Sequence, residues 1–290
     1  MNNVIYEKAY AKINLGLEVK KRRADGYHDL DMIMVSIDHF DTLSFSIDSK
    51  ITVTSDVFVC DMAENIIYKT AKIMQEKYQV AQGASITIIK RIKIGGGIGG
   101  GSSDAAATIK GLNHLWNLQM SDKEMYEIAE MVGSDVSFCL HKYPARVTGK
   151  GEKIESIKIK KPFFVLLICP DYAINTKDIY ELYDKKFHIP INLMDKLENE
   201  LKSDNIIHAT KYMHNDLEET VYEYLKEHKL KTNYEIIREA VIFGANRAIM
   251  TGSGSTIICF ASTRGQLVKI KKQIQQKNKD YKLVIARALI

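Results

Sequence analysis

The sequence is poor in the residues that build disulfides, zinc sites and rigid turns. Its 290 residues include only four cysteines, four prolines and one tryptophan. The cysteines are widely scattered in or near apolar runs, and they form no C-x-x-C pair: Cys60, Cys139, Cys169 and Cys259. This pattern predicts reduced core thiols in a cytosolic protein and disfavours a structural zinc site.

Long apolar runs and strong net charge are also missing. The longest apolar stretch, Phe163 to Cys169, is too short to span a bilayer, and the N-terminal residues lack the apolar core of a secretory signal. We therefore expect a cytoplasmic protein with no membrane partner. The formal net charge of +5 is mild. It suits a protein that handles small anions, and it is too weak to indicate a nucleic-acid partner by itself.

Glycine, by contrast, is concentrated in one segment. Six of the seven residues from 95 to 101 are glycine, and Ser102, Ser103 and Asp104 follow directly. Such a run gives up side-chain packing and chain entropy, so it indicates that bare backbone N–H groups converge on one small space. At the start of a helix that space is an anion site, and a polyphosphate is its common occupant.

Other glycine-loop motifs fit this segment poorly. It is not a P-loop, because no lysine follows the glycines. It matches G-x-G-x-x-G formally at Gly95, Gly97 and Gly100, but it lies in the middle of a domain, and no strand with an acidic end follows. A flexible linker is disfavoured, because an alternating strand precedes the loop and a patterned helix follows it. We expect Ser102 or Ser103 to cap that helix.

Apolar periodicity predicts strands and helices in both halves of the chain. In the first half, strands are expected over residues 3–19, 33–55 and 84–94, and helices over 65–78 and from a capping box at 121–124 to about 133. In the second half, strands are expected over 163–168 and 257–260, and an amphipathic helix over 264–282. This mixture indicates an α+β protein with a domain boundary near residue 155, giving domains 1–155 and 156–290.

Two polar segments are candidates for phosphoryl-transfer chemistry. Lys12 and Asn14 share one face of a predicted strand, which indicates a lined cleft or, alternatively, a solvated edge strand. Asp135 follows a predicted helix end, where it is either a helix N-cap or the acceptor of a hydroxyl proton. Transfer of a phosphoryl group to an alcohol needs such an acceptor and a cation against the developing charge. Lys12 and Asp135 would supply these two functions.

Two turns are further candidates. The loop around Tyr27 and His28 carries an aromatic ring and an imidazole, which can stack on a planar base or merely cap the loop. The small-residue turn at Gly252 and Ser253 is either a tight structural turn or a phosphate contact.

The order of these segments resembles the galactose, homoserine, mevalonate and phosphomevalonate (GHMP) kinase superfamily. The resemblance runs from about residue 5 to about residue 260, through segments 11–15, 25–28, 65–68, 97–106, 133–136 and 250–254. The triple glycine before Ser-Ser-Asp and the Asp-Gly-Tyr-His loop match members that phosphorylate a cytidine-diphosphate-linked methylerythritol in isoprenoid precursor synthesis. The resemblance implies an N-terminal domain like that of ribosomal protein S5, a ferredoxin-like C-terminal domain, and a substrate site in the cleft between them.

The resemblance also implies roles for individual residues. Asp135 would take the proton from the 2-hydroxyl of the substrate, and Lys12 would hold the charge that builds there. Residues implied in ATP binding are Asn65, Lys90, Lys93, Ile94, Gly95, Gly96, Gly97, Ile98, Gly99, Gly100, Gly101, Ser102 and Ser103. Residues implied in substrate binding are Asn14, Tyr27, His28, Thr176, Tyr180, Gly252 and Ser253, of which the three aromatic rings would hold the cytosine.

The chain departs from the family pattern at a few positions. Lys93 stands where a proline is usual, and His214 stands where an arginine is common. Mg²⁺ is expected with ATP, because the charge of the polyphosphate must be offset during transfer. Its protein ligands cannot be read from the sequence, and Ser103 and Glu152 are candidates. The alternatives are another small-molecule kinase of the superfamily and a non-catalytic nucleotide-binding regulator. We expect a monomer or a homodimer.

Overall fold

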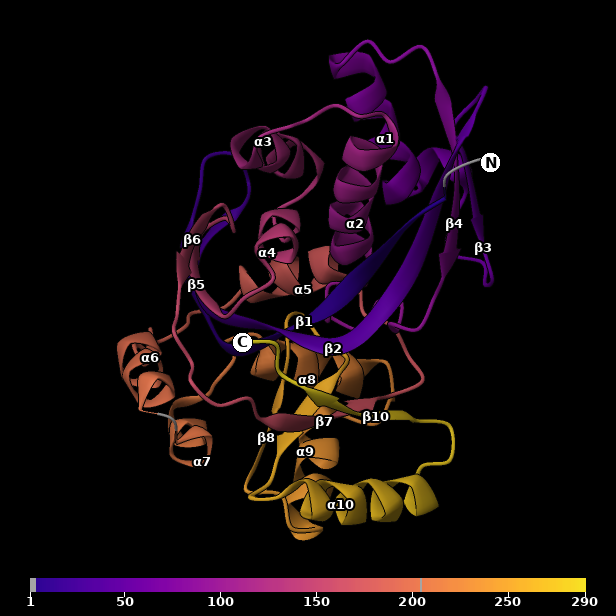
Figure 1. Cartoon of the computed structure of the whole chain (residues 1–290). Coiled ribbons are helices and arrows are strands. Elements are labelled where there is room, and N and C mark those ends of the chain that lie inside the picture. Colours follow the sequence, from indigo (N-terminus) through magenta and orange to yellow (C-terminus); the bar gives the residue numbers. More distant parts are fainter. Residues whose placement is uncertain (1–3, 204) are drawn as a thin grey trace. The chain divides into compact units, whose positions relative to one another are not determined.

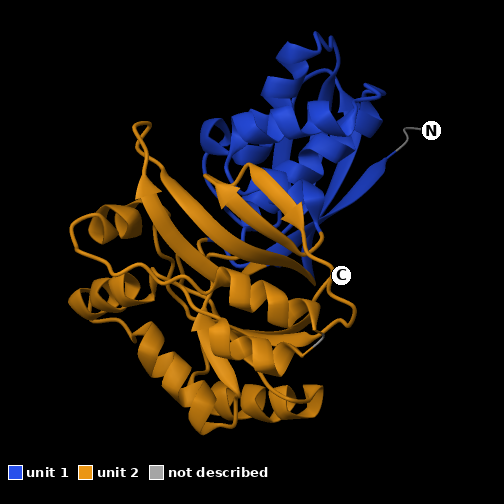
Figure 2. Ribbon diagram, turned by 90° about the vertical axis from the view of Figure 1, so that its left-hand side faces the viewer, with its two compact units in different colours: residues 1–12, 39–94, 99–142 blue, residues 13–38, 95–98, 143–290 orange. Residues whose placement is uncertain are grey.

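The computed structural model describes residues 4–203 and 205–290, which form two compact units (Figure 2). Unit 1 contains the chain up to Lys12 together with His39–Ile94 and Gly99–Lys142. Unit 2 contains Ile13–Asp38, Gly95–Ile98 and the chain from Tyr143 onward. Strands β1 (Ile5–Arg22) and β2 (His28–Asp48) contribute to both units. Because the units are built from interleaved segments, the boundary near residue 155 stays a prediction.

Unit 1 is a small sheet covered by helices (Figure 1). The C-terminal part of β2 pairs antiparallel with β4 (Gly83–Ile89), and β3 (Thr52–Ser55) pairs parallel with β4. The helices are η1 (Met62–Glu64), α1 (Ile66–Lys77), α2 (Gly100–Leu115), α3 (Asp122–Val132) and α4 (Val136–His141). Apolar residues of α1, α2, α3 and α4 pack with Phe45 and Ile86 of the sheet in one apolar core, which holds α2 from Ala105 to Leu115.

Unit 2 contains antiparallel strands and most of the helices. The N-terminal part of β2 pairs with β5 (Ala145–Gly149), which pairs with β6 (Lys153–Ser156). A separate four-stranded sheet has the order β10-β7-β9-β8. Its strands are β7 (Phe164–Cys169), β8 (Arg247–Met250), β9 (Ile257–Phe260) and β10 (Lys282–Arg287). The helices are α5 (Thr176–Tyr183), α6 (Met194–Lys202), α7 (Ile206–Ala209), η2 (Thr210–Tyr212), α8 (Glu218–Glu227), α9 (Asn233–Ile242) and α10 (Arg264–Lys277).

Local sequence signals located several elements correctly. Ser121 and Glu124 form the predicted capping box of α3. Helix α10 buries Leu267, Ile270 and Ile274 on one face, which confirms the amphipathic helix, although it ends at Lys277 and residue 282 begins β10. The predicted strand 33–55 is wrong in its bounds, because β2 begins at His28, ends at Asp48 and is followed by the separate strand β3.

The predicted serine cap of α2 is wrong. The helix begins at Gly100, and Gly99 occupies the N-cap position with a left-handed φ of 70°. Glycine adopts this conformation at little cost, so the helix can start before the serines are reached. The Ser103 hydroxyl lies inside the first turn and donates a hydrogen bond to the backbone oxygen of Tyr10 at 2.6 Å.

Two predicted absences can be compared with the described residues. None of the four cysteines, all of which lie in the described ranges, forms a disulfide. No helix in the described ranges has the length and apolar character that a membrane span requires.

Candidate active site

Lys12 and Asp135 come together in unit 1. The ammonium nitrogen of Lys12 lies 3.2 Å from Oδ2 of Asp135. Asp135 directly precedes α4, but its side chain makes no capping hydrogen bond there, so the N-cap interpretation of its carboxylate is not supported. Gly99 makes room for this pair, because a Cβ at that position would lie 2.6 Å from Cγ of Lys12. The ion pair therefore lies directly beside the start of α2.

The start of α2 has the properties of an anion site. The first backbone N–H groups of a helix lack partners within the helix, and the helix dipole adds partial positive charge there. In α2 these groups belong to Gly100, Gly101 and Ser102. The two glycines have no side chain and the serine has a small one, so little covers the backbone at this point. A phosphate group bound at this point would lie next to Lys12 and Asp135.

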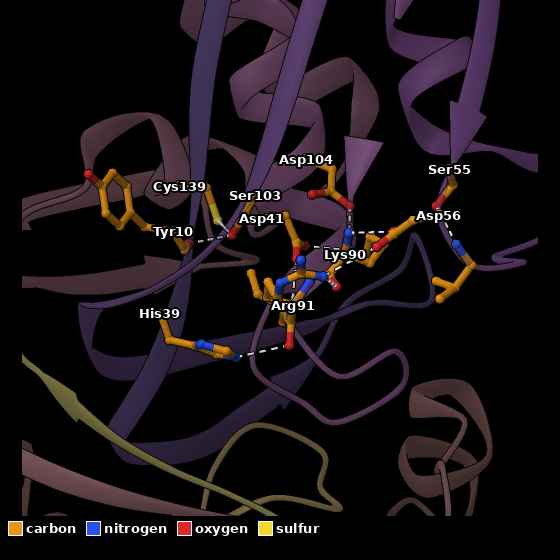
Figure 3. A network of polar contacts seen from close by, with 12 residues as sticks. Tyr10, His39, Asp41, Ser55, Asp56, Lys90, Arg91, Ser103, Asp104 and Cys139 are labelled. Carbon is orange, nitrogen blue, oxygen red and sulfur yellow. Dashed lines mark hydrogen bonds and ion pairs between the residues drawn. The ribbon is translucent and has the colours of Figure 1, made fainter. Parts of the chain in front are cut away.

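A buried ion triad joins the glycine segment to the sheet of unit 1 (Figure 3). The ammonium nitrogen of Lys90 lies 2.5 Å from Oδ2 of Asp41 and 2.7 Å from Oδ2 of Asp104. Asp41 also accepts hydrogen bonds from the backbone N–H groups of Arg91 and Ile92. Lys90 was predicted in the ATP site, which stays a prediction, and its side chain links Asp41 of β2 to Asp104 of α2.

The triad has unusual protonation properties. Burial raises the pKa of Asp104 to about 8, with the Lys90 charge lowering it and the Asp41 charge raising it. Burial alone would lower the pKa of Lys90, but the two carboxylates outweigh it and raise that pKa. Within the described part of the chain, the second carboxylate oxygen of Asp104 is buried and has no hydrogen-bond partner. The sequence showed Asp104 inside the glycine motif but gave no signal for Asp41.

Four further residues that were predicted to bind ATP also lie in unit 1. Asn65 caps α1, where its side-chain oxygen accepts a hydrogen bond from the Ile67 N–H at 2.9 Å. Lys93 is half-buried and Ile94 is exposed in the segment after β4. Ser103 is buried, and its hydroxyl also lies 3.4 Å from the Cys139 sulfur.

The first half of the glycine loop packs in unit 2 against the turn between β8 and β9. A Cβ at Gly97 would lie 2.5 Å from the backbone oxygen of Gly254, and one at Gly252 would lie 2.5 Å from the oxygen of Gly97. Both glycines have positive φ angles, 72° and 58°. The N–H of Thr256 donates to the oxygen of Gly96 at 3.2 Å. The late glycine turn therefore supports the loop by direct backbone contact.

Other predicted substrate residues surround the same turn. The backbone N–H of Asn14 donates to the Thr251 hydroxyl at 2.7 Å, and the Asn14 side chain is buried. The hydroxyl oxygens of Thr176 and Ser253 lie 2.7 Å apart. Thr251 was not predicted, because a threonine hydroxyl beside a glycine turn carries no distinctive sequence signal.

Two of the three rings predicted to hold the cytosine, those of His28 and Tyr180, form a stacked pair in unit 2. The rings of His28 and Tyr180 have centroids 5.1 Å apart and an interplanar angle of 24°. Nε2 of His28 lies 2.7 Å from Oδ1 of Asp184, which fixes the orientation of the imidazole. Tyr27 is 57% exposed, with the Lys150 ammonium 5.8 Å from its ring centroid. This arrangement offers planar faces and polar edges to a flat heterocycle. Asp184 was not predicted.

The described residues contain no cluster of three or more His, Cys, Asp and Glu side chains that could hold a metal ion. Of the two candidate ligands, Glu152 accepts a hydrogen bond from the Lys150 N–H at 2.7 Å, and Ser103 donates to Tyr10. The partly exposed carboxylate of Asp135 is the kind of ligand that a Mg²⁺ ion arriving with phosphate groups takes, because such ions commonly keep one or two carboxylates, phosphates and water as ligands.

Comparisons with known proteins give a consistent result. Residues 65–143 match the family model of the GHMP kinase N-terminal domain. A Bacillus cytotoxicus protein named 4-diphosphocytidyl-2-C-methyl-D-erythritol kinase is 40% identical over 256 residues, covering 86% of each chain. A protein of the same name from Thermodesulfovibrio yellowstonii is 37% identical over 257 residues, covering 86% of this chain and 87% of the relative.

Solved structures give the fold. A crystal structure of 4-(cytidine 5'-diphospho)-2C-methyl-D-erythritol kinase matches with a TM-score of 0.78 at 24% identity, covering 98% of this chain and 99% of the other. Homoserine kinase from Cytophaga hutchinsonii matches with a TM-score of 0.77 at 16% identity, covering 100% and 96%. The predicted α+β fold is confirmed.

Proposed function

Because the chain belongs to the GHMP kinases, and within them to the 4-diphosphocytidyl-2-C-methyl-D-erythritol kinases, we propose that Lys12 and Asp135 carry its phosphoryl transfer. The chain is an ATP-dependent phosphotransferase that acts on an alcohol group of a small molecule in isoprenoid precursor synthesis. The roles of individual residues are our proposal, and the Lys12–Asp135 contact is the observation that carries it.

In the proposed step, the carboxylate of Asp135 accepts the proton of the substrate 2-hydroxyl. The hydroxyl oxygen forms a bond to the γ-phosphorus of ATP while the bond from that phosphorus to the β,γ-bridging oxygen breaks, and ADP leaves. Lys12 orients the carboxylate at 3.2 Å and offsets the negative charge that gathers on the transferred group. A positioned base of this kind contributes roughly 10²- to 10⁴-fold to the rate.

The start of α2 binds the phosphates in this proposal. Its free N–H groups and helix dipole favour negative charge, and the absence of side chains on the glycines lets a phosphate approach the backbone closely. Bound Mg²⁺ would supply further positive charge to the polyphosphate. The backbone of Gly97 packs closely against the turn between β8 and β9. In this proposal, that contact holds the glycine loop in the conformation that binds the phosphates.

The stacked pair of His28 and Tyr180 recognises the cytosine in this proposal. An imidazole whose Nε2 is held by Asp184 at 2.7 Å presents its other ring nitrogen in a fixed direction, and the tyrosine ring adds an apolar face. Asn14, Thr176 and Ser253 would then contact the remainder of the substrate.

The discriminating experiment measures ADP release with ATP and magnesium for three acceptors. These are the cytidyl methylerythritol substrate, mevalonate and homoserine. Turnover with the first acceptor alone, together with a higher KM for that acceptor in His28→Ala, supports the proposal. Turnover with mevalonate or homoserine would redirect the assignment to another kinase of the superfamily, and nucleotide binding without turnover would favour a regulator. Cytoplasmic location and a monomeric or homodimeric state stay predictions.

A further inference from the structure

Unit 1 contains a pocket separate from the catalytic pair. Its volume is about 350 Å³, at the small end of the range of about 300 to 1,000 Å³ typical of small-molecule sites. Strand β1 contributes residues 6–10 to it, α2 contributes four residues, and Cys139 and Lys142 come from α4 and the residue that follows it. Among the described lining residues, Ser103 belongs to the predicted ATP site, and neither Lys12 nor Asp135 is present.

Positive charge is in excess around this pocket. Lys8, Lys110 and Lys142 line it together with a single carboxylate, that of Glu7. The Lys110 ammonium donates a hydrogen bond to the backbone oxygen of Leu140 at 3.1 Å, which leaves it further hydrogens to donate. The Lys142 ammonium lies 4.4 Å from the centroid of the Tyr10 ring. The excess is therefore two positive charges, held on side chains from separate elements.

The same charges act on the protonation of two lining residues. Burial lowers the pKa of Lys110, the Glu7 charge raises it, and the Lys142 charge lowers it by less than Glu7 raises it. Burial also raises the pKa of Glu7, against the opposing effect of His114, Lys110 and Lys142. Lys110 and Lys142 thus repel one another, and Glu7 offsets that repulsion at Lys110. A bound anion would offset the net positive charge that remains on the lining lysines.

The remaining walls are apolar and small. Ala9, Ala106 and Ala107 are between 2% and 3% exposed, and their methyl groups leave room where a larger side chain would fill the pocket. Tyr6 and Tyr10 add aromatic surface beside the lysines. A suitable ligand therefore has a compact doubly charged head and a short organic body. A phosphate ester meets this requirement, since its charge is about −1.5 to −2 and lysine is a common phosphate partner.

We infer that this pocket is an effector site for a phosphate monoester of a small alcohol, distinct from the nucleotide site. Ser103 connects the pocket to the ATP-binding helix, because it lies in the first turn of α2 and its hydroxyl contacts both Tyr10 and Cys139 (Figure 3). Cys139 lies in α4, which begins immediately after Asp135. Occupancy should therefore change the KM for ATP.

The test is isothermal titration with glycerol 3-phosphate while an unreactive ATP analogue and magnesium fill the nucleotide site. Wild type is compared with Lys142→Gln, with the double variant Lys110→Gln/Lys142→Gln, and with Lys123→Gln, an exposed lysine of α3 outside the pocket. We expect saturable binding that weakens about tenfold or more in the double variant and is unchanged in Lys123→Gln. Uncharged glycerol should not bind, and glycerol 3-phosphate should shift the KM for ATP in wild type and in Lys123→Gln but not in the double variant.

Three outcomes would overturn the inference. They are equal affinity in wild type and the double variant, displacement of glycerol 3-phosphate by the ATP analogue, and no binding at millimolar concentration. Binding without a change in KM would remove the effector role. Should the double variant fail to fold, the single Lys142→Gln variant decides, because it keeps the Lys110 contact with Leu140. None of these binding results depends on which alcohol the kinase phosphorylates.

Discussion

The ammonium nitrogen of Lys12 lies 3.2 Å from Oδ2 of Asp135, and the two side chains differ in their access to solvent, at 5% and 32% exposed. The buried lysine is fixed against Gly99, while the carboxylate remains accessible from solution. This difference suits a base that must receive a substrate hydroxyl and a cation that must stay in place.

Replacing the carboxylate should abolish most of the activity without loss of nucleotide binding. We expect Asp135→Asn to lower kcat by roughly 10²- to 10⁴-fold, because the amide cannot accept the hydroxyl proton. The KM for ATP should not rise, since a neutral side chain repels phosphate less than a carboxylate does. Steady-state kinetics check this, with the exposed Asp122→Asn as a control. Comparable turnover in Asp135→Asn and wild type would remove Asp135 from the proposed mechanism.

A methyl group at Gly97 should disturb the glycine loop. Its Cβ would lie 2.5 Å from the Gly254 backbone oxygen, and its φ of 72° adds strain of roughly 1–2 kcal/mol for alanine. We therefore expect Gly97→Ala to lower kcat/KM for ATP by at least about tenfold. Gly265→Ala is the matched control, because its nearest contact would be the Thr263 hydroxyl at 3.8 Å. Equal effects of the two substitutions would argue against a role for the backbone contact.

Removing Lys90 should destabilise the protein strongly. Lys90→Met leaves the carboxylates of Asp41 and Asp104 buried without their cation, at a cost of about 3–5 kcal/mol in the free energy of unfolding. Lys77→Met, which removes the exposed ion pair with Glu127 and a distant contact with the Tyr78 ring, should cost less than about 1 kcal/mol. Urea denaturation measures both. A small effect of Lys90→Met would mean that the triad contributes little to folding.

The stability should fall with rising pH through Glu218. Burial raises the pKa of this carboxyl from 4.5 to about 7, against the opposing effect of the hydrogen bond from the Met250 N–H. The folded protein thus holds a proton that the unfolded chain releases, so this contribution is complete below pH 4.5 and is lost as the pH rises through 7.

The expected loss is at most roughly 3 kcal/mol in the free energy of unfolding. Glu218→Gln should remove this part of the pH dependence, because the amide oxygen can still accept the Met250 hydrogen bond and carries no charge. Denaturation midpoints between pH 5 and 8 check it, with the exposed Glu219→Gln as a control. An unchanged slope in Glu218→Gln would assign the dependence to other groups.

The sequence alone determined the elements whose signals are local. The capping box at Ser121 and the apolar face of α10 each depend on residues within a few positions of one another, so they can be read without the fold. The glycine run likewise indicated a phosphate loop, because a segment almost without side chains offers mainly its backbone N–H groups for binding. The resemblance to the GHMP kinases then placed Lys12 and Asp135 in one site.

Only the tertiary structure decided which distant residues meet. The Lys90 side chain proved to bind Asp41 and Asp104, and His28 to bind Asp184, 156 positions away. Contacts of this kind depend on strand register and helix packing, which local propensity does not specify. The start of α2 also depends on a distant contact. Gly99 packs against Lys12 and has a left-handed φ, so the helix begins at Gly100, before the serines that the sequence predicted as its cap.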